Sequence, residues 1–185
     1  TWNPVWGKQS TVLNEYNRFV LSVRETGNLN RKMKIIFCVY DEGMALRYEI
    51  PEQSSVNGFV INKDLTSFAV DGERFFWTPN GERANIGPVQ VSRVKEKFSR
   101  KENFQTPMVF EADDSYCLAI HEAATYNFSY SRLKSIAENR FQFVMESSTG
   151  QTPAKTAWRV FMIGNNAGEL LESNLLYNLN PKCAI

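Results

Sequence analysis

The sequence predicts an all-β fold in which antiparallel sheets pack against each other as a sandwich. Short extended runs recur at close spacing and are separated by Gly, Pro, Asn and Asp residues, a pattern typical of sandwiches and barrels. The clearest hairpin joins Met33 to Tyr40 with Met44 to Ile50 through Asp41-Glu42-Gly43. The apolar periodicity predicts no long amphipathic helix. We therefore expect strands in packed layers around one core.

The other elements follow from the same pattern of apolar residues and turn residues. Thr156 to Ile163 carries apolar residues on both faces, which predicts a central strand. Thr78 to Gly87 and Ser147 to Ala154 are expected to be loops, and Val89 to Ser99 a solvated basic edge. The remaining predicted strands are Thr11 to Val23, Val56 to Ile61, Leu65 to Val70, Arg74 to Trp77, Tyr126 to Ile136, Arg140 to Glu146 and Asn174 to Leu179.

A second hairpin, from Met108 to Ala124, contains the first candidate for function. Tyr116, Leu118 and Ile120 share one face of its second strand, and Glu122 continues that face. Burying a lone carboxylate is costly, so Glu122 either reaches water past the rim of the sheet or has a cationic partner. The residue pattern leaves two roles open for it, a solvated acid at a strand end and a calcium ligand.

Composition excludes several classes of protein. The 185 residues fit one domain, and 21 Lys and Arg against 20 Asp and Glu leave a net charge of +1. No overall field would attract nucleic acid or an anionic membrane, and the apolar runs are shorter than a membrane-spanning helix needs. The three cysteines stand apart without zinc-finger spacing, so Cys38 and Cys117 are expected to be buried free thiols.

Catalytic chemistry finds little support within the chain. His121 is the single histidine, and we expect it to be a packed residue rather than a base. His121-Glu122 lacks the second histidine of a zinc-protease motif, and no glycine-rich phosphate loop occurs. Glu111 and Glu122 could form a carboxylate pair for glycoside cleavage, but their unequal distances from the turn make direct opposition unexpected.

Long motifs in a fixed order connect the chain to a known family. They are Trp2-Asn-Pro-Val-Trp-Gly7, Asn14-Glu-Tyr-Asn17, Val39-Tyr-Asp-Glu-Gly-Met-Ala-Leu-Arg-Tyr-Glu-Ile-Pro51, Leu118-Ala-Ile-His-Glu-Ala-Ala124, Thr156-Ala-Trp-Arg159 and the run from Ile163 to Asn180. Over nearly its whole length the chain resembles the N-terminal domain of glycoside hydrolase family 97, the α-glucosidases and α-galactosidases of Bacteroides-type bacteria.

The resemblance implies much more than the residues do. It implies a β-supersandwich of the galactose-mutarotase type, packed on a (β/α)8 barrel that carries the catalytic carboxylates beside a calcium ion. We expect residues 1–185 to be a single sandwich domain, a fragment of a calcium-dependent, exo-acting α-glycoside hydrolase without its first strands and barrel. The partners would be that barrel and an α-linked oligosaccharide. The location would be periplasmic or secreted, and the fragment alone would be inactive.

The resemblance also assigns roles to residues. Glu122 matches the carboxylate that this domain lends to the calcium ion of the barrel. Gln142, Phe143 and Val144 align with a segment that touches the sugar in the α-glucosidase branch, although the Glu-Ser-Trp pattern of that branch is absent here. Ordinary sandwich core is the alternative for those three residues. An arginine holding Glu122 inside the fold, away from any exposed seam, would contradict the calcium role.

Two hypotheses from other classes remain open. A free-standing carbohydrate-binding module could use Trp2, Trp6 or Trp77 as stacking platforms, because tryptophan presents a large flat apolar face. An interaction scaffold without ligands could present the same kind of exposed apolar surface.

Overall fold

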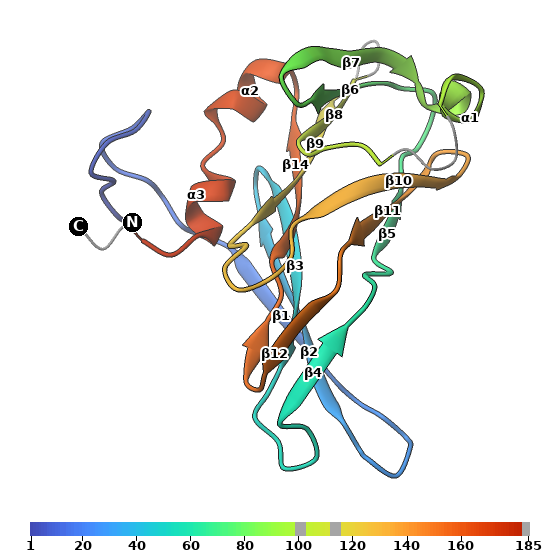
Figure 1. Cartoon of the computed structure of the whole chain (residues 1–185). Helices are drawn as coiled ribbons and strands as arrows, with labels where there is room; N and C mark the ends of the chain where they lie inside the picture. The colour runs from blue at the N-terminus through green and yellow to red at the C-terminus, as the bar shows by residue number, and fades with distance from the viewer. Residues whose placement is uncertain (99–102, 112–115, 183–185) are drawn as a thin grey trace.

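The computed structural model describes residues 1–98, 103–111 and 116–182 of the chain, and it confirms the all-β prediction (Figure 1). The largest sheet is antiparallel with the order β1-β2-β3-β14-β9-β8-β6-β7, and β13 also pairs with β3. Its strands are β1 (Asn17–Arg24), β2 (Lys32–Tyr40), β3 (Gly43–Ile50), β6 (Phe75–Asn80), β7 (Arg83–Gln90), β8 (Met108–Glu111), β9 (Cys117–Ala123), β13 (Ala154–Lys155) and β14 (Trp158–Gly164).

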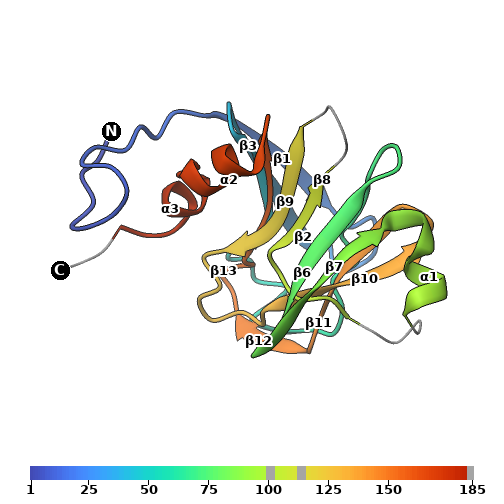
Figure 2. The same cartoon turned by 90° about the horizontal axis from the view of Figure 1, so that it is seen from above.

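Two smaller sheets complete the β-structure of the described residues. One has the order β10-β11-β5, and the other pairs β12 with β4. Their strands are β4 (Gly58–Ile61), β5 (Ser67–Ala69), β10 (Ser131–Ala137), β11 (Arg140–Met145) and β12 (Ser148–Gln151). Both sheets lie across from the largest one, so the molecule has the layers of a sandwich (Figures 1 and 2).

Both predicted hairpins and the predicted central strand are confirmed. Strands β2 and β3 pair antiparallel, as do β8 and β9, while the turn at 112–115 lies outside the described residues. Strand β14 runs between β3 and β9 and is buried along most of its length. A strand enclosed on both sides and both faces is expected to be mainly apolar, which explains its sequence apart from Arg159.

Two predicted loops are wrong because strands occupy them. Pro79 and Gly81 within 78–87 suggested a loop, but β6 and β7 form a hairpin there whose turn contains Gly81 at φ +61°. Residues 147–154 contain β12 and the start of β13. The Gly and Pro residues within and between these strands gave a stronger loop signal than the strands' own residue pattern.

Helices replace two predicted extended segments. The predicted closing strand at 174–179 is α3 (Leu175–Leu179), which follows α2 (Ala167–Glu172). The predicted basic edge contains a 3₁₀ turn, η1 (Val91–Arg93), and α1 (Val94–Lys97), whose Val91 and Val94 are buried. Helices as short as α1 and α3 leave little periodicity in a sequence, so these two were missed, whereas α2 lies where Glu169 to Ser173 were expected to make one helical turn.

The middle strands of the largest sheet are covered on both faces, whereas β1 at its end is largely exposed. On one face, a core rich in phenylalanine fills the space toward the smaller sheets; its members include Phe76, Phe104, Phe110, Phe141 and Phe143. On the other face, Leu175 and Leu179 of α3 pack over Ala119, Ala123 and Val160. Figure 2 shows α2 and α3 on that side of the sheet. Burying the second face in this way explains why β9 alternates large and small apolar residues.

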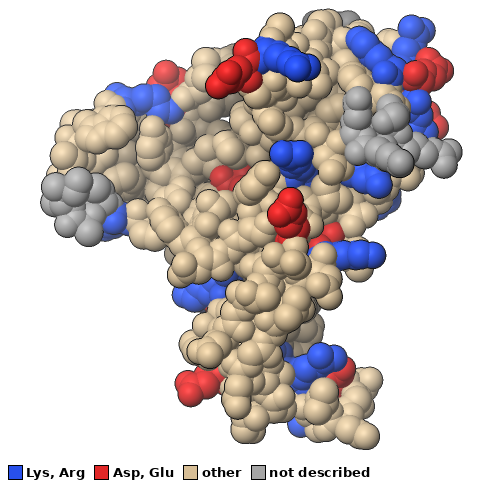
Figure 3. All heavy atoms as spheres, in the orientation of Figure 1, with Lys and Arg blue, Asp and Glu red and all other residues tan. Residues whose placement is uncertain are grey.

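The remaining expectations concern cysteines, charge and membranes. Cys38 and Cys117 are buried free thiols as predicted, and Cys183 lies outside the described residues. Lysine, arginine, aspartate and glutamate are scattered over the face shown in Figure 3, in keeping with the small net charge. Among the described residues, no helix has the length and apolar character needed to span a membrane.

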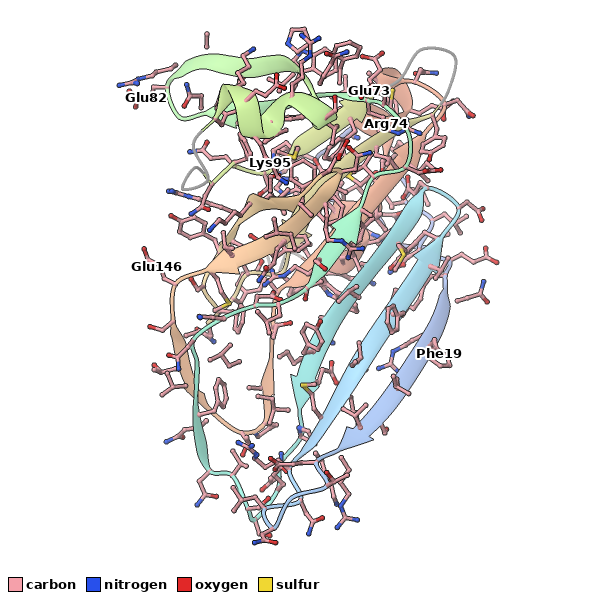
Figure 4. The ribbon with its side chains drawn as sticks, turned by 90° about the vertical axis from the view of Figure 1, so that its right-hand side faces the viewer. Phe19, Glu73, Arg74, Glu82, Lys95 and Glu146 are labelled. Atoms are coloured by element: carbon pink, nitrogen blue, oxygen red, sulfur yellow. The ribbon has the colours of Figure 1, made fainter. Side chains whose placement is uncertain are left out.

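Strand β1 lies at one end of the largest sheet, and the side chain of its Phe19 is 61% exposed (Figure 4).

Candidate functional site

A buried cluster of charged residues lies between the sheets and joins Asp64, Glu122 and Arg159. The Arg159 guanidinium donates to Asp64 Oδ2 from Nε at 2.9 Å and from Nη2 at 2.6 Å, and it donates to Glu122 Oε1 from Nη1. The three side chains are 7%, 5% and 1% exposed, respectively. One guanidinium therefore neutralises two carboxylates at a site almost closed to water. We call these three residues the Arg159 cluster.

Strand register brings the cluster together. Glu122 of β9 and Arg159 of β14 are direct partners across an antiparallel pair, so their side chains leave the sheet on the same face. Asp64 comes from the segment between β4 and β5, where its Oδ1 accepts the Thr66 backbone N–H at 2.8 Å. Glu122 Oε2 accepts the Ser131 N–H at 2.7 Å at the start of β10. The cluster thus links the largest sheet to the segment that carries Asp64 and to the start of β10.

Aromatic rings and burial set the electrostatics of the cluster. The guanidinium carbon of Arg159 lies 5.0 Å from the ring centre of Phe143 and 6.0 Å from that of Phe128. Burial raises the pKa of Glu122 above its usual range, against the opposing effect of the Arg159 charge, and the nearby Asp64 charge adds to the rise. With two acids and one base, the cluster carries a surplus negative charge when fully ionised.

Glu122 is therefore placed differently from the predicted rim position. The prediction of a solvated acid at a strand end is wrong, and the alternative of a cationic partner is confirmed by Arg159. Arg159 holds the carboxylate inside the fold, which meets the first of the two conditions named above against a calcium role. Among the described residues, no three His, Cys, Asp or Glu side chains gather as metal ligands. The described residues alone do not supply the ligands of a calcium site, so the calcium role of Glu122 stays a prediction for the intact enzyme.

The three residues predicted to touch sugar follow one another along β11 but have different surroundings. Gln142 donates its amide to the Asp64 carbonyl oxygen at 2.9 Å, and Phe143 is fully buried beside the Arg159 cluster. Val144 lines a shallow hollow of about 120 Å³ with Tyr130, Arg132 and Glu146. The edge of the molecule that carries Glu146 is visible in Figure 4. Gln142 and Phe143 contact the Arg159 cluster or the backbone of its members. Of the three residues, only Val144 lines the hollow.

The other sequence candidates for catalysis separate. Extending the register of β8 and β9 places Glu111 opposite Cys117, five residues from Glu122, which corresponds to roughly 16 Å along a strand. That separation is too large for a pair of glycosidase carboxylates, which need about 5 to 10 Å. His121 is half-buried, its Nδ1 accepts the Glu122 N–H at 2.8 Å, and burial lowers its pKa. These contacts are those of a packed histidine.

The tryptophans predicted as stacking platforms have three different environments. Trp6 is 83% exposed. Trp2 is half-buried and donates its indole N–H to Asn178 Oδ1 at 2.9 Å. Trp77 is half-buried with its ring close to Gly87. Of the three, only Trp6 is exposed.

Sequence reasoning missed a cleft beside the Arg159 cluster. Two adjoining cavities of about 380 and 410 Å³ lie between β3, β4, β12 and the segment 124–130, and both are lined by Tyr48, Ile50, Ile61, Phe128 and Thr156. Phe59 and Tyr126 line the first cavity, and Asp64 lines the second. We call the two cavities the aromatic cleft. Its four aromatic residues come from three separate parts of the chain, β3, β4 and the segment 124–130, and the fold brings these parts together.

Fold and site define a class: an antiparallel β-sandwich domain with a charged cluster between its layers. Comparison with known proteins gives the family. The profile of the glycosyl-hydrolase 97 N-terminal family matches residues 1–181, and the chain belongs to that family.

Solved structures agree with this assignment. A glycoside hydrolase family 97 enzyme from Pseudoalteromonas sp. strain K8, in complex with acarbose, matches with a TM-score of 0.85 and 25% identity over 97% of this chain. A variant of such an enzyme from the same strain, in complex with panose, matches with a TM-score of 0.84 and 25% identity, also over 97% of this chain. In both cases the match covers 28% of the other chain, so this chain spans under a third of those enzymes. A beta-arabinopyranosidase shares the fold over 82% of this chain and 32% of its own, with a TM-score of 0.61 and 14% identity.

Proposed function

We propose that this chain is the non-catalytic sandwich domain of an exo-acting α-glycoside hydrolase and braces a catalytic (β/α)8 barrel. The observation that carries the proposal is the match of residues 1–181 to the N-terminal family together with the 28% coverage of the related enzymes. The rest of such an enzyme is long enough to hold a separate catalytic domain. The site supports the same role, because its charged groups are used internally rather than offered to a substrate.

The experiment compares two proteins, the 185-residue chain and the full-length enzyme that contains it. With p-nitrophenyl α-glucoside and α-galactoside as substrates, the full-length enzyme should release p-nitrophenol and the chain alone should not. Adding the separately produced remainder of the enzyme should give a complex with this chain, detected by size-exclusion chromatography. Substantial turnover by the purified chain, or no association with the remainder, contradicts the proposal.

The calcium role of Glu122 stays a prediction for the intact enzyme. Each Glu122 oxygen already has one contact, with Arg159 or with the Ser131 N–H, although a carboxylate offers about four acceptor positions. A calcium ion would require further oxygen ligands from outside the described residues, because it takes about six to eight. When bound, it would polarise an oxygen of the substrate or of water.

A matched pair of variants tests that role. Glu122→Gln in the full-length enzyme should weaken calcium binding, measured by titration calorimetry, while the fold is retained. Asp64→Asn, which removes the other carboxylate of the Arg159 cluster, is the control and should change calcium affinity less. Equal calcium affinity in the Glu122→Gln variant and the parent enzyme removes the assignment.

Two other predictions come from the family resemblance. The sugar contact expected for Gln142, Phe143 and Val144 stays a prediction, and the hollow that Val144 lines with Tyr130, Arg132 and Glu146 offers a place to test it. In the intact enzyme, Arg132→Ala should then raise KM for an α-glucoside, and an unchanged KM contradicts the contact. The periplasmic or secreted location stays a prediction that cell fractionation tests.

A further inference from the structure

We propose that the aromatic cleft binds a short α-linked gluco-oligosaccharide on this chain itself. The inference rests on the proposed function, which makes such sugars available to the protein. It concerns neither the tryptophans nor the hollow beside Val144.

The walls of the cleft have the shape and chemistry that sugar rings require. Tyr48 of β3, Phe59 of β4, and Tyr126 and Phe128 of the segment 124–130 all line the first cavity. Aromatic faces stack against the C–H face of a pyranose, and each cavity lies within the roughly 300 to 1,000 Å³ typical of small-ligand sites. Figure 4 shows β4 and β12 on one side and β2 and β3 on the other, with side chains projecting between them.

Fixed contacts hold several of these walls in place. The Tyr48 hydroxyl lies 2.8 Å from Thr66 Oγ1, and Thr66 donates its backbone N–H to Asp64 of the Arg159 cluster. The ring of Phe59 lies directly against Gly150 of β12, where a Cβ atom would meet it at 2.6 Å. Phe128 faces the Arg159 guanidinium. The cleft is therefore largely preformed, which lowers the entropic cost of binding.

The polar groups of the cleft favour a neutral, hydroxyl-rich ligand. Asn127 and Gln151 line it, and their side-chain amides have no hydrogen-bond partner among the described residues. Each amide offers two donors and one carbonyl acceptor, which suits the mixed donor and acceptor character of sugar hydroxyls. Three charged residues line the cleft: Asp64 pairs with Arg159, Lys155 Nζ lies 3.9 Å from Glu49, and Lys63 forms no ion pair among the described residues. The related enzymes in complex with acarbose and panose point to α-linked glucosides as the sugars to test.

Titration of the 185-residue chain with panose, followed through backbone amide shifts in NMR spectra, tests the inference without any enzymatic activity. Shifts should gather at 126–128 and 149–156, and Tyr126→Ala should weaken binding roughly tenfold through loss of one stacking face. Tyr126 is 63% exposed, so its removal should leave the fold intact. Gln151→Ala, at an exposed amide, should also weaken binding.

Trp6→Ala is the matched control, because Trp6 is exposed, aromatic and outside the cleft. Its affinity for panose should equal that of the parent chain. Absence of shifts at about 20 mM panose overturns the inference, since that concentration detects even weak binding. Shifts that gather elsewhere, or affinity that is lost in Trp6→Ala but kept in Tyr126→Ala, overturn it as well. If panose does not bind while the full-length enzyme cleaves α-glucosides, the cleft fails and the proposed function stands.

Discussion

Replacing Arg159 by Met tests the Arg159 cluster most severely. The substitution keeps an unbranched side chain of similar length but leaves Asp64 and Glu122 buried without their cation. Removing one partner of a buried ion pair costs about 3 to 5 kcal/mol, because the remaining charge is neither hydrated nor paired. For a domain of this size, that loss lowers the melting temperature by roughly 6 to 20 °C.

Urea denaturation followed by tryptophan fluorescence measures the loss, because buried Trp158 adjoins the substituted position. Arg31→Met is the matched control: it removes an arginine whose ion pair with Glu25 lies at the surface, and it should leave the urea midpoint unchanged. Adding Asp64→Asn and Glu122→Gln to Arg159→Met should restore part of the stability by removing both orphaned charges. A loss below about 1 kcal/mol in Arg159→Met would refute the reasoning.

Three further predictions concern single positions. In the folded protein the pKa of Glu122 is raised above its ordinary value of 4.5, so the contribution of this group to stability is full below pH 4.5 and is lost as pH rises through the folded pKa. Glu122→Gln should remove this decline from the pH profile of the unfolding free energy. A variant profile identical to that of the parent contradicts the prediction. Gly43→Ala should destabilise the fold by about 1 to 3 kcal/mol in urea titrations, because Gly43 has φ +141° and a Cβ would collide with the Phe161 carbonyl. Unchanged stability would contradict the close approach of Gly43 to the Phe161 backbone. Burial raises the thiol pKa of Cys38 and Cys117, so both should react with a thiol reagent only on unfolding, and rapid labelling of the native chain would show otherwise.

The sequence was sufficient for strands with a clear apolar pattern and insufficient for the short helices and for the β6–β7 hairpin, although β7 has eight residues. Strands β2, β3, β9 and β14 have six or more residues with clear alternation or continuous apolar character, and each was predicted. Helices α1 and α3 have four and five residues, too few for a helical period to stand out. The β6–β7 hairpin was hidden because Pro79, Gly81 and Gly87 lie within or between its strands.

The site was predicted only in part, for a physical reason. The alternation of β9 identified Glu122 as a carboxylate on an apolar face, and the energetic argument that it needs a cation was correct. The identity of that cation depends on the pairing of β9 with β14, and Asp64 approaches from a segment with no regular structure. Register between distant strands and the path of a loop are not local properties, so neither Arg159 nor Asp64 could be found from spacing.

The most decisive experiment measures hydrolysis of p-nitrophenyl α-glucoside by the purified 185-residue chain beside the full-length enzyme at equal molar concentration. The full-length enzyme should hydrolyse the substrate, and the chain should show no hydrolysis above background, because its candidate acids Glu111 and Glu122 are too far apart to act together. Sustained multiple turnovers by the chain alone would contradict the view that it supports a catalytic domain.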